Sequence, residues 1–344
     1  MRGVILHGGA GTRLRPLTHS GPKQLIKIAG KPISMWGVQQ LISFGISELC
    51  VVLGENHPEQ VVEFYGDGSW LGAKVTYIYQ GEPLGLAHAI YLTKECTRGE
   101  DFVVYLGDNV VLEKIDSLIK FKGAASILLA KVEDPSRFGV ALVEGGRVRR
   151  VVEKPKESIS DLALVGVYGF TQEVFEVIEG LSPSWRGELE ITDAIQGLID
   201  RGKEVTFSVI EGWWKDTGTV RDLLDANLFL LDRYMNRSLR GSVNNSVVEG
   251  RVVVEEGALV EGSIIRGPVY IGRESVVKDS RVMPFTSLGE RCRVQNSSIE
   301  NSLVLDGSSI EGVELADSII GRNSRVSKSH RSSLVVGEGS VVKL

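Results

Sequence analysis

Short apolar runs and amphipathic stretches alternate along the first two thirds of the chain. Six runs are apolar and rich in β-branched residues, which predicts strands covered on both faces, at 4–6, 49–53, 75–79, 102–106, 126–130 and 164–170. Between them, apolar residues recur at helical spacing over 35–42 and 191–199, and Gly45 and Gly202 follow as helix-stop signals. This alternation predicts a mostly parallel α/β sheet whose ligand site lies at the carboxyl ends of its strands.

A third helix is predicted from its start signal. Thr219 and Asp222 have the spacing of a capping box, and the apolar residues Leu223, Leu224 and Leu228 follow. In a capping box each of the two side chains accepts a hydrogen bond from the backbone N–H group of the other residue. We therefore expect a helix to begin at Thr219.

The pattern changes from about Ser242 onward. Six aliphatic residues fall at a strict spacing of six, namely Val247, Val253, Leu259, Ile265, Ile271 and Val277. An amphipathic helix has no such period, and an ordinary strand alternates by two. Pairs of an aliphatic residue and a glycine then recur at separations of 17, 32 and 16 residues, at Ile271-Gly272, Leu288-Gly289, Ile320-Gly321 and Val336-Gly337.

These periods fit a solenoid with one turn every sixteen to eighteen residues and three short strands per turn. In such a hexapeptide β-helix the aliphatic residues fill a narrow core, here from about Val247 to Val341, and glycines turn the corners. A glycine-rich antiparallel sandwich is the alternative, and six consecutive aliphatic residues in one register argue against it. The sequence therefore predicts two domains, an α/β domain over 1–235 and a hexapeptide-repeat domain over 242–344.

Composition places the chain among ordinary globular proteins. Apolar residues make up 42% of its 344 residues and charged residues 24%. The 39 basic and 44 acidic residues give a net charge of −5, which argues against a protein that binds nucleic acid or anionic membranes. No apolar run approaches the roughly 18 residues of a membrane span, and the first residues do not form a signal peptide.

The cysteines and histidines show no clustering in the sequence. Cys50, Cys96 and Cys292 lie far apart and outside CxxC spacing, so neither a disulfide framework nor a zinc knuckle is predicted. We therefore expect a cytoplasmic protein in a reducing compartment. The histidines are expected to be structural or exposed, and they are His7, His19, His57, His88 and His330.

A glycine turn, GGAGTRL at 8–14, directly follows the first predicted strand. Glycines let a backbone approach phosphates closely and offer N–H donors to them. The stretch lacks the Gly-Lys-Ser/Thr of a Walker A loop, and Leu14 replaces the third glycine of the dinucleotide-binding fingerprint. Alone it would be an ordinary tight turn, but Arg13 and Lys23 place two cations beside it, which suits a triphosphate.

Two carboxylates stand in glycine-containing turns that follow apolar residues. Asp108 lies in the stretch YLGDN after the predicted strand 102–106, and Asp216 lies in the stretch WWKDTG. Carboxylate oxygens are ligands that Mg²⁺ prefers, so the two aspartates could share one ion. Aspartate is also common in turns and at helix N-caps, and spacing alone leaves that alternative open.

Two further stretches are weaker indications of a site. Glu153 and Lys154 precede Pro155, and the three residues could equally form an ordinary exposed strand end. Gln80 is followed by a glycine turn, so its amide could read the edge of a base. Neither stretch identifies a ligand without the others.

Together, nine stretches resemble the sugar-1-phosphate nucleotidylyltransferases, and most of all the long-form glucose-1-phosphate thymidylyltransferases. They are GGAGTRLRPLT, GPKQL, QGEPLGLAHA, YLGDN, DPSRFGV, VEKPKE, ALVGVY, SWRGELEITDAI and WWKDTG. Their order and spacing agree with that family over nearly the whole chain, including the hexapeptide tail. The resemblance implies an α/β, Rossmann-like nucleotidyltransferase domain followed by a left-handed parallel β-helix.

The resemblance also implies which residues bind the nucleotide and the metal. The phosphate-binding positions of the family correspond to Gly8, Gly11, Thr12, Arg13 and Lys23. The positions around the pyrimidine correspond to Gln24, Gln80 and Gly85. The Mg²⁺ ligands correspond to Asp108 and Asp216, and the catalytic residues to Arg13, Lys23 and Asp108.

The sugar-binding positions are implied in the same way. They correspond to Gly139, Glu153, Leu164, Gly166 and Trp214, with Lys154 on the sugar phosphate. The family often has threonine where Val165 stands, so one hydroxyl contact to the sugar is lost here.

The implied reaction is Mg²⁺-dependent transfer of a thymidylyl group from dTTP to glucose 1-phosphate, which gives dTDP-glucose and pyrophosphate. The attacking phosphate oxygen is already an anion and needs no general base, so positioned cations can supply the catalysis. Thymine differs from uracil by one methyl group, which an apolar pocket distinguishes by only about 1–3 kcal/mol. Use of UTP, or of a broader set of sugar phosphates, is therefore the alternative.

Two functions of other classes compete with this interpretation. Hexapeptide β-helices often bind acyl-CoA, so the tail could acetylate an amino sugar and make the enzyme bifunctional. Such tails use a histidine base, and only His330 lies in this tail.

The second alternative is a catalytically silent regulatory subunit with the same fold. Such a subunit should have lost the charged site residues, all of which are present. The flat faces of a β-helix also leave room for a homo-oligomer.

Overall fold

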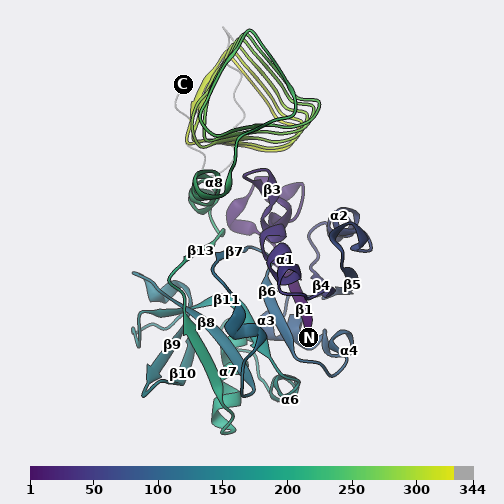
Figure 1. Cartoon of the computed structure of the whole chain (residues 1–344). Helices are drawn as coiled ribbons and strands as arrows, with labels where there is room; N and C mark the ends of the chain where they lie inside the picture. The colour runs from purple at the N-terminus through teal and green to yellow at the C-terminus, as the bar shows by residue number, and fades with distance from the viewer. Residues whose placement is uncertain (329–344) are drawn as a thin grey trace. The chain divides into compact units, whose positions relative to one another are not determined.

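The computed structural model describes residues 1–328 of the chain. Three features predicted from the sequence, His330, Val336-Gly337 and Val341, lie outside the described residues. The chain divides into two compact units, Met1–Ala226 and Asn227–Leu344 (Figure 1). The division falls inside helix α8, Val220–Tyr234, and the domain boundaries at 235 and 242 remain a prediction.

A nine-stranded sheet forms the centre of the first unit. One half is parallel in the order β6-β1-β4-β5, with bounds Phe102–Leu106, Arg2–His7, Glu48–Leu53 and Lys74–Tyr79. The other half contains β8 (Ala125–Lys131), β9 (Gly139–Glu144), β10 (Arg147–Glu153), β11 (Leu162–Phe170) and β12 (Val205–Val209). All six strands predicted from apolar runs are confirmed.

The second half corrects the prediction of a mostly parallel sheet. β11 pairs antiparallel with β6, β8 and β9, and β9 pairs antiparallel with β10. The turn between β9 and β10 shows the physical reason. Gly145 and Gly146 both have positive φ, 57° and 74°, as a two-residue hairpin requires, so the chain returns at once without a crossover helix.

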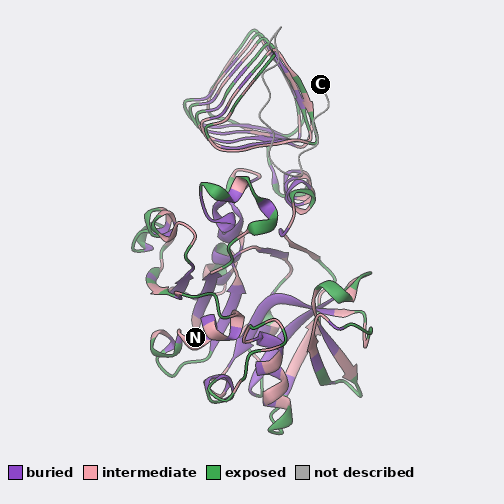
Figure 2. Cartoon of the chain, turned by 180° about the vertical axis from the view of Figure 1, so that it is seen from behind, coloured by how far each residue is buried: buried purple, intermediate pink, exposed green. Residues whose placement is uncertain are grey.

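Helices cover both faces of this sheet (Figure 1). One face packs against α1 (Ile33–Ser43), α2 (Pro58–Tyr65) and α5 (Asp116–Ile119), and the other against α3 (Leu86–Tyr91), α6 (Glu173–Ile178) and α7 (Ile191–Asp200). The strands of this sheet are largely buried (Figure 2). Successive strand residues point to opposite faces, so Val51 and Val52 are buried in different cores. The predicted helices over 35–42 and 191–199 are confirmed as α1 and α7.

Short elements complete the first unit. They are β2 (Lys27–Ile28), β3 (Lys31–Pro32), β7 (Asn109–Leu112), β13 (Trp213–Asp216), α4 (Lys94–Thr97) and single 3-10 turns at Thr12–Leu14, Leu17–His19, Lys23–Leu25, Ser69–Leu71 and Pro135–Arg137. No helix among residues 1–328 is long and apolar enough to cross a membrane.

The start of α8 has the predicted capping box. The Thr219 Oγ1 atom accepts a hydrogen bond from the Asp222 N–H group at 3.2 Å. The Asp222 carboxylate accepts one from the Thr219 N–H group at 3.1 Å. The two side chains therefore satisfy two backbone donors that the first turn of a helix leaves without partners.

The second unit is a left-handed parallel β-helix with a triangular cross-section (Figure 1). Its first side contains β14 (Ser238–Leu239), β17 (Val252–Val254), β20 (Val269–Ile271), β23 (Thr286–Leu288), β26 (Leu303–Val304) and β29 (Ile319–Ile320). The second contains β15 (Ser242–Asn244), β18 (Leu259–Glu261), β21 (Val276–Lys278), β24 (Arg293–Gln295), β27 (Ser309–Glu311) and β30 (Arg325–Ser327). The third contains β16 (Val247–Glu249), β19 (Ile264–Arg266), β22 (Arg281–Val282), β25 (Ser298–Glu300) and β28 (Glu314–Ala316).

Serine side chains stack at one corner of the β-helix and show the length of each coil. The hydroxyl oxygen of Ser246 accepts a hydrogen bond from the N–H group of Ser263, and the pattern repeats from Ser263 to Ser280 and from Ser280 to Ser297. Each step spans 17 residues, and the next, from Ser297 to Val313, spans 16. The predicted solenoid period is therefore confirmed.

The strict spacing of six is wrong in the first coils. Core positions with 0% exposure are Val254, Val260, Ile265, Ile271, Val277 and Val282. Val247, in contrast, is 49% exposed, and Leu259 lies beside the core position. Three steps of six would make 18 residues, whereas a coil here has 17, so one step in each coil is shortened by one residue.

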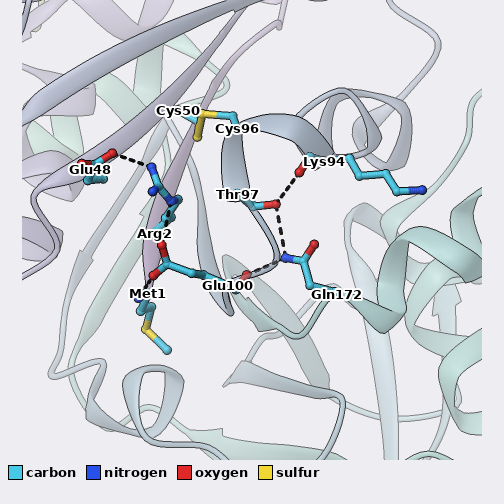
Figure 3. Close-up of polar contacts among 9 residues, drawn as sticks. All are labelled: Met1, Arg2, Glu48, Cys50, Lys94, Cys96, Thr97, Glu100 and Gln172. Atoms are coloured by element: carbon cyan, nitrogen blue, oxygen red, sulfur yellow. Dashed lines mark hydrogen bonds and ion pairs between the residues drawn. A yellow bond between two sulfur atoms is a disulfide. The ribbon is translucent and has the colours of Figure 1, made fainter.

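Cys50 on β4 and Cys96 on α4 form a disulfide, although the spacing of the cysteines predicted no disulfide framework (Figure 3). The two residues are 46 positions apart, but their Cα atoms lie 6.2 Å apart because the chain crosses back over the sheet. Cys292 is free and buried. The expectation of a reducing compartment therefore loses the support that it drew from unpaired cysteines.

Candidate active site

The carboxyl ends of four neighbouring parallel strands meet at one edge of the sheet. Gly8 follows β1, Gly54 follows β4, Gln80 follows β5, and Asp108 lies two residues beyond β6. Residues far apart in the sequence are thus brought together at the edge where α/β sheets bind their ligands. These residues therefore lie at the edge of the sheet where the sequence predicts the ligand site.

Two cavities that share Leu86, Leu106 and Asp108 open at this edge. The first, of about 390 Å³, is lined by the glycine turn, Gln80 and the start of α3, and we call it the nucleotide cavity. The second, of about 520 Å³, is lined by residues of β10, β11 and β13, and we call it the sugar cavity. The Asp108 carboxylate therefore stands where the two cavities meet.

The glycine turn fits between the Gln80 amide and the Lys23 side chain. A Cβ atom on Gly8 would lie 2.4 Å from Gln80 Oε1, and one on Gly9 would lie 3.2 Å from Lys23 Cε. Gly11 has a φ of 64°, and its carbonyl accepts a hydrogen bond from Thr18 at 2.8 Å. Side chains in the turn would therefore displace the two groups that flank it.

A two-stranded ribbon brings the predicted metal ligands together. β7 and β13 pair antiparallel with Asn109 opposite Asp216, so Asp108 and Asp216 lie at the same end of the ribbon. Thr217, which is fully buried, donates its N–H group at 3.1 Å and its hydroxyl at 2.7 Å to the Asp108 carbonyl. The position of the Asp108 backbone is therefore fixed from the Asp216 side.

The ammonium group of Lys23 forms an ion pair with the Asp108 carboxylate. Burial opposes the ionised form of Asp108, but the Lys23 charge and hydrogen bonds from Lys23 and Asn109 outweigh it and lower the pKa of the carboxyl. Burial and the negative charge of Asp108 raise the pKa of Asp216 to about 6, although Lys23 and Arg13 act against this shift. The two carboxylates therefore have unequal affinities for a proton.

This carboxylate pair fits a magnesium ion. A divalent cation between the two aspartates would relieve the repulsion that raises the pKa of Asp216. Among residues 1–328 no group of three or more His, Cys, Asp or Glu side chains could hold a metal ion. Mg²⁺ is usually bound by one or two carboxylates together with waters and substrate phosphates, so two aspartates are sufficient.

Close packing around two glycines shapes the sugar cavity. A Cβ atom on Gly139 would lie 2.6 Å from Thr192 Cγ2, and one on Gly166 would lie 2.8 Å from Asn109 Cγ. The Asn109 side chain donates to Asp108 Oδ1 at 3.0 Å and accepts from Trp214 Nε1 at 2.7 Å. One amide therefore links the Asp108 carboxylate to the Trp214 indole, which lines the sugar cavity.

Three carboxylates surround the guanidinium group of Arg186. Its nitrogen atoms lie 3.6 Å from Glu153, 3.0 Å from Glu188 and 3.1 Å from Glu190. Burial and the charge of Glu190 raise the pKa of Glu153, although Lys154 and Arg186 act in the opposite direction. The sugar cavity therefore contains both cations and acceptors for hydroxyl groups.

The loop over 80–85 is fixed to the segment that carries Arg186. The Leu189 N–H group donates to the Leu84 carbonyl at 2.7 Å, and the Ala87 N–H group donates to the Leu189 carbonyl at 3.0 Å. The Gln80 amide donates to the Gly85 carbonyl at 3.2 Å. Gly85 has a φ of 111°, and a Cβ atom there would lie 2.5 Å from the Leu189 carbonyl oxygen.

The structure brings most of the predicted site residues together. The nucleotide cavity is lined by Gly8, Gln24, Gln80, Gly85 and Asp108. The sugar cavity is lined by Arg13, Asp108, Gly139, Glu153, Lys154, Leu164, Gly166, Trp214 and Asp216. Three predicted residues, Gly11, Thr12 and Lys23, line neither of these two cavities, and Lys23 reaches the site through its ion pair with Asp108.

Several lining residues had been assigned no role from the sequence. They are Leu86, Asn109, Arg137, Phe138, Tyr168, Arg186 and Thr192 in the sugar cavity and Glu188 in the nucleotide cavity. All eight lie inside the stretches that carry the resemblance, so the sequence marks their segments but not their roles. Arg186 in particular is a cation in the stretch SWRGELEITDAI, but no spacing indicates that its side chain turns toward Glu153.

Comparison with known proteins shows the family to which the chain belongs. Residues 2–233 match the nucleotidyl transferase family, and residues 233–301 match the GlmU-like C-terminal hexapeptide family. A glucose-1-phosphate thymidylyltransferase of Streptomyces antibioticus is 46% identical over 100% of this chain and 99% of its own length. The chain belongs to the family of glucose-1-phosphate thymidylyltransferases.

Other members and relatives extend the comparison. A low-salt glycan biosynthesis nucleotidyltransferase of Haloferax volcanii is 44% identical over the full length of both chains. A bifunctional GlmU protein of Methanococcus maripaludis is 35% identical over 94% of this chain and 78% of its own length. A crystal structure from Bacillus anthracis, assigned as a glucose-1-phosphate thymidylyltransferase, has a TM-score of 0.63 and 37% identity over 69% of this chain and 97% of that one.

Membership in the glucose-1-phosphate thymidylyltransferase family confirms the fold class and the enzyme class predicted from the sequence. The chain is a nucleotidyltransferase that acts on a nucleoside triphosphate and a sugar 1-phosphate. The roles of individual residues, the base and the metal are proposals.

Proposed function

We propose that the chain transfers a thymidylyl group from dTTP to glucose 1-phosphate in a Mg²⁺-dependent reaction. The observation that carries the proposal is the position of Asp108, which is paired with Lys23, at the junction of the nucleotide and sugar cavities. A phosphorus atom at this junction lies within reach of ligands in both cavities. Cations placed there stabilise the charge that spreads over the phosphoryl oxygens in the transition state.

The residues of the chain position two anionic substrates. Gly8, Gly11 and Thr12 would hold the triphosphate by their backbone, and Arg13 would bind the leaving pyrophosphate. Lys154 would hold the sugar phosphate, and Glu153 would accept sugar hydroxyls. The attacking phosphate oxygen is an anion at neutral pH, so proximity and charge stabilisation are sufficient and no base is assigned.

Asp108 and Asp216 would hold the magnesium ion, which supplies Lewis-acid stabilisation of the phosphoryl oxygens when bound. We expect Asp108→Asn and Asp216→Asn each to lower kcat at least a hundredfold, roughly 3 kcal/mol of barrier. Far-ultraviolet circular dichroism checks that the fold is intact, and Asp67→Asn, an exposed turn residue, is the control. Wild-type kcat in either variant at saturating Mg²⁺ would remove that aspartate from the metal site.

Gln80 and the backbone of Gly85 would read the pyrimidine edge, with Gln24 nearby. Both Gln80 and Gln24 are buried beside the glycine turn, as amides that select a base should be. The test is pyrophosphate release with glucose 1-phosphate and each of dTTP, UTP, CTP, ATP and GTP. Equal or faster turnover with ATP or GTP would contradict the pyrimidine assignment, and equal turnover with UTP would make the enzyme a broader pyrimidine nucleotidylyltransferase.

Assembly and location belong to the same proposal. We expect the enzyme to work in the cytoplasm, where nucleoside triphosphates are synthesised, and to form a homo-oligomer through flat faces of the β-helix. Light scattering of the full chain measures the assembly size, and a monomer at micromolar concentration would contradict the oligomer.

A further inference from the structure

A third cavity, of about 490 Å³, shares Glu153 with the sugar cavity. Besides Glu153, the charged, amide and aromatic residues that line this third cavity are Arg149, Arg150, Trp185, Glu190, Asp193 and Gln196. The Glu190 carboxylate is already paired with Arg186 at 3.1 Å. Its volume is close to that of the sugar cavity and within the range of small-molecule sites. Neither the family resemblance nor the proposed reaction assigns a role to it.

Two adjacent arginines line this cavity. The pairing of β10 with β9 shifts register between Val148 and Arg150, so Arg149 is an extra residue in the strand. Both arginines are exposed, and they line the third cavity together with the next three residues of β10, 151–153. Among residues 1–328, neither guanidinium group has an ion pair or hydrogen bond. Two cations are therefore available for an anionic ligand.

A large aromatic side chain borders the same cavity. Trp185 is 78% exposed, the most exposed of the large hydrophobic side chains among the described residues. The backbone next to it is anchored, because the Ser184 N–H group donates to the Glu188 carbonyl at 2.8 Å and the Ser184 hydroxyl donates to Glu190 at 2.9 Å. An exposed indole offers a flat apolar face to a ring.

The third cavity also contains an acceptor for hydroxyl groups. Asp193, on the first turn of α7, is half-buried and has no hydrogen-bond or ion-pair partner among residues 1–328. Desolvation by burial raises the pKa of its carboxyl. Gln196 is already engaged, because it accepts from the Val151 N–H group and donates to Asp200. The Asp193 carboxylate is therefore free to accept a hydrogen bond from a hydroxyl group of a bound ligand.

These groups repeat the chemistry of the sugar cavity, where Glu153, Lys154 and Trp214 supply a carboxylate, a cation and an aromatic wall. We propose that the third cavity is a second binding site for a phosphorylated monosaccharide. Arg149 and Arg150 bind the phosphate, Trp185 packs against one face of the sugar ring, and Asp193 accepts its hydroxyls. Because Glu153 lines both cavities, a ligand here acts on sugar binding in the catalytic site.

The test is calorimetric titration of the full chain with glucose 1-phosphate, without nucleotide or metal. We expect two equivalents for the wild type and one for Arg149→Ala/Arg150→Ala. Arg147→Ala removes an exposed cation from the same strand outside the cavity and should keep both equivalents. Lys154→Ala, in the sugar cavity, should weaken the other equivalent. Trp185→Phe should remove the change in tryptophan fluorescence that accompanies the second equivalent.

Separate titrations distinguish the ligand classes. Glucose without phosphate and inorganic phosphate without sugar should each bind this site at least tenfold more weakly than glucose 1-phosphate. Tighter binding of dTMP that depends on Arg149 and Arg150 would make the cavity a nucleotide site and overturn the proposal. Binding of a single equivalent of glucose 1-phosphate to the wild type would also overturn the proposal. So would an Arg149→Ala/Arg150→Ala variant that binds as many equivalents as the wild type but has a tenfold higher KM for glucose 1-phosphate. If the chain binds two equivalents of glucose 1-phosphate but shows no turnover with dTTP, the second site is supported and the proposed function is contradicted.

Discussion

In the nucleotide cavity, close packing by neighbouring residues restricts which amino acid can occupy a position. Gly85 combines a φ of 111° with close packing, since a Cβ atom added to it would lie 2.5 Å from the Leu189 carbonyl oxygen. Neither constraint can be relieved by a side-chain rotation, because one is the residue's own backbone and the other is a backbone neighbour. The loop over 80–85, which we propose reads the base, therefore depends on a residue without a side chain.

We expect Gly85→Ala to raise the KM for dTTP at least tenfold, because the loop must move away from Leu189 and from the base. Steady-state kinetics with varied dTTP measure the effect. Gly81→Ala is the matched control: it has a positive φ of 67° in the same loop, but no atom lies within 4 Å of its added Cβ. An equal loss in both variants would show that backbone strain alone, and not the contact with Leu189, is responsible.

His7 gives a prediction about pH. Burial lowers its pKa to about 3, although the negative charge of Asp108 acts against this shift. The unfolded chain takes up a proton near pH 6.5 and the folded chain does not, so stability is complete above pH 6.5 and falls as the pH is lowered toward 3. We expect a loss of about 2 kcal/mol between pH 7.5 and 5 from this residue. Urea unfolding of His7→Gln should show a shallower pH dependence, and an unchanged slope would contradict the assignment.

At the residue scale, the sequence indicates the charged groups better than the contacts between them. Asp108, Asp216 and Glu153 could be chosen because their residue types suit the chemistry of the family. The amide of Asn109 could not be chosen in this way, because its position depends on a hydrogen bond from Trp214. The guanidinium of Arg186 could not be chosen either, because its position depends on ion pairs with three carboxylates. Such contacts have no fixed spacing in the sequence.

At the scale of elements, apolar runs predict the strands of the sheet but not their directions. The run 164–170 gives no sign that β11 lies antiparallel to β6, because burial on both faces looks the same in either orientation. In the β-helix, a period near six is visible, but the single shortened step in each coil is not. The side that a strand presents to the core changes with that step, which is why Val247 is exposed.

The disulfide between β4 and α4 should contribute to stability rather than to catalysis. It closes a loop of 46 residues, for which restriction of the unfolded chain contributes about 2–4 kcal/mol. We expect Cys50→Ala/Cys96→Ala to lower the Tm by several degrees with less than a twofold change in kcat, because the cavities lie at the other ends of the strands. A reductant should lower the Tm of the wild type and leave the variant unchanged. Equal effects of the reductant on both proteins would contradict the disulfide.

For the whole molecule, every residue assigned to nucleotidyl transfer lies in the first unit, at or before Asp216. We therefore expect a chain that ends after residue 235 to keep nucleotidyl transfer, with a lower Tm or a smaller assembly size. Coupled pyrophosphate assays and light scattering measure these properties. Loss of activity in a chain that is still folded by circular dichroism would show that the second unit contributes to the site.

The bifunctional alternative is tested on the full chain. We expect no acetyl-CoA turnover with glucosamine 1-phosphate, because the tail carries a single histidine, His330, which lies outside the described residues. Release of free thiol from acetyl-CoA measures the reaction. Activity that disappears in His330→Ala would make the protein bifunctional.

The stacked serines of the β-helix have a consequence for how such a tail can change in length. Each hydroxyl joins one coil to the next, and the partner of Ser263 on either side is again a serine 17 residues away. Duplication or deletion of one complete coil would therefore keep the hydrogen bonds between the stacked serines of successive coils. It would also keep every aliphatic core residue facing inward. An insertion of three or four residues would instead turn the following side chains away from the core. The tail is thus free to evolve in whole coils, and the length of the rod can vary without any change in the chemistry of the first unit.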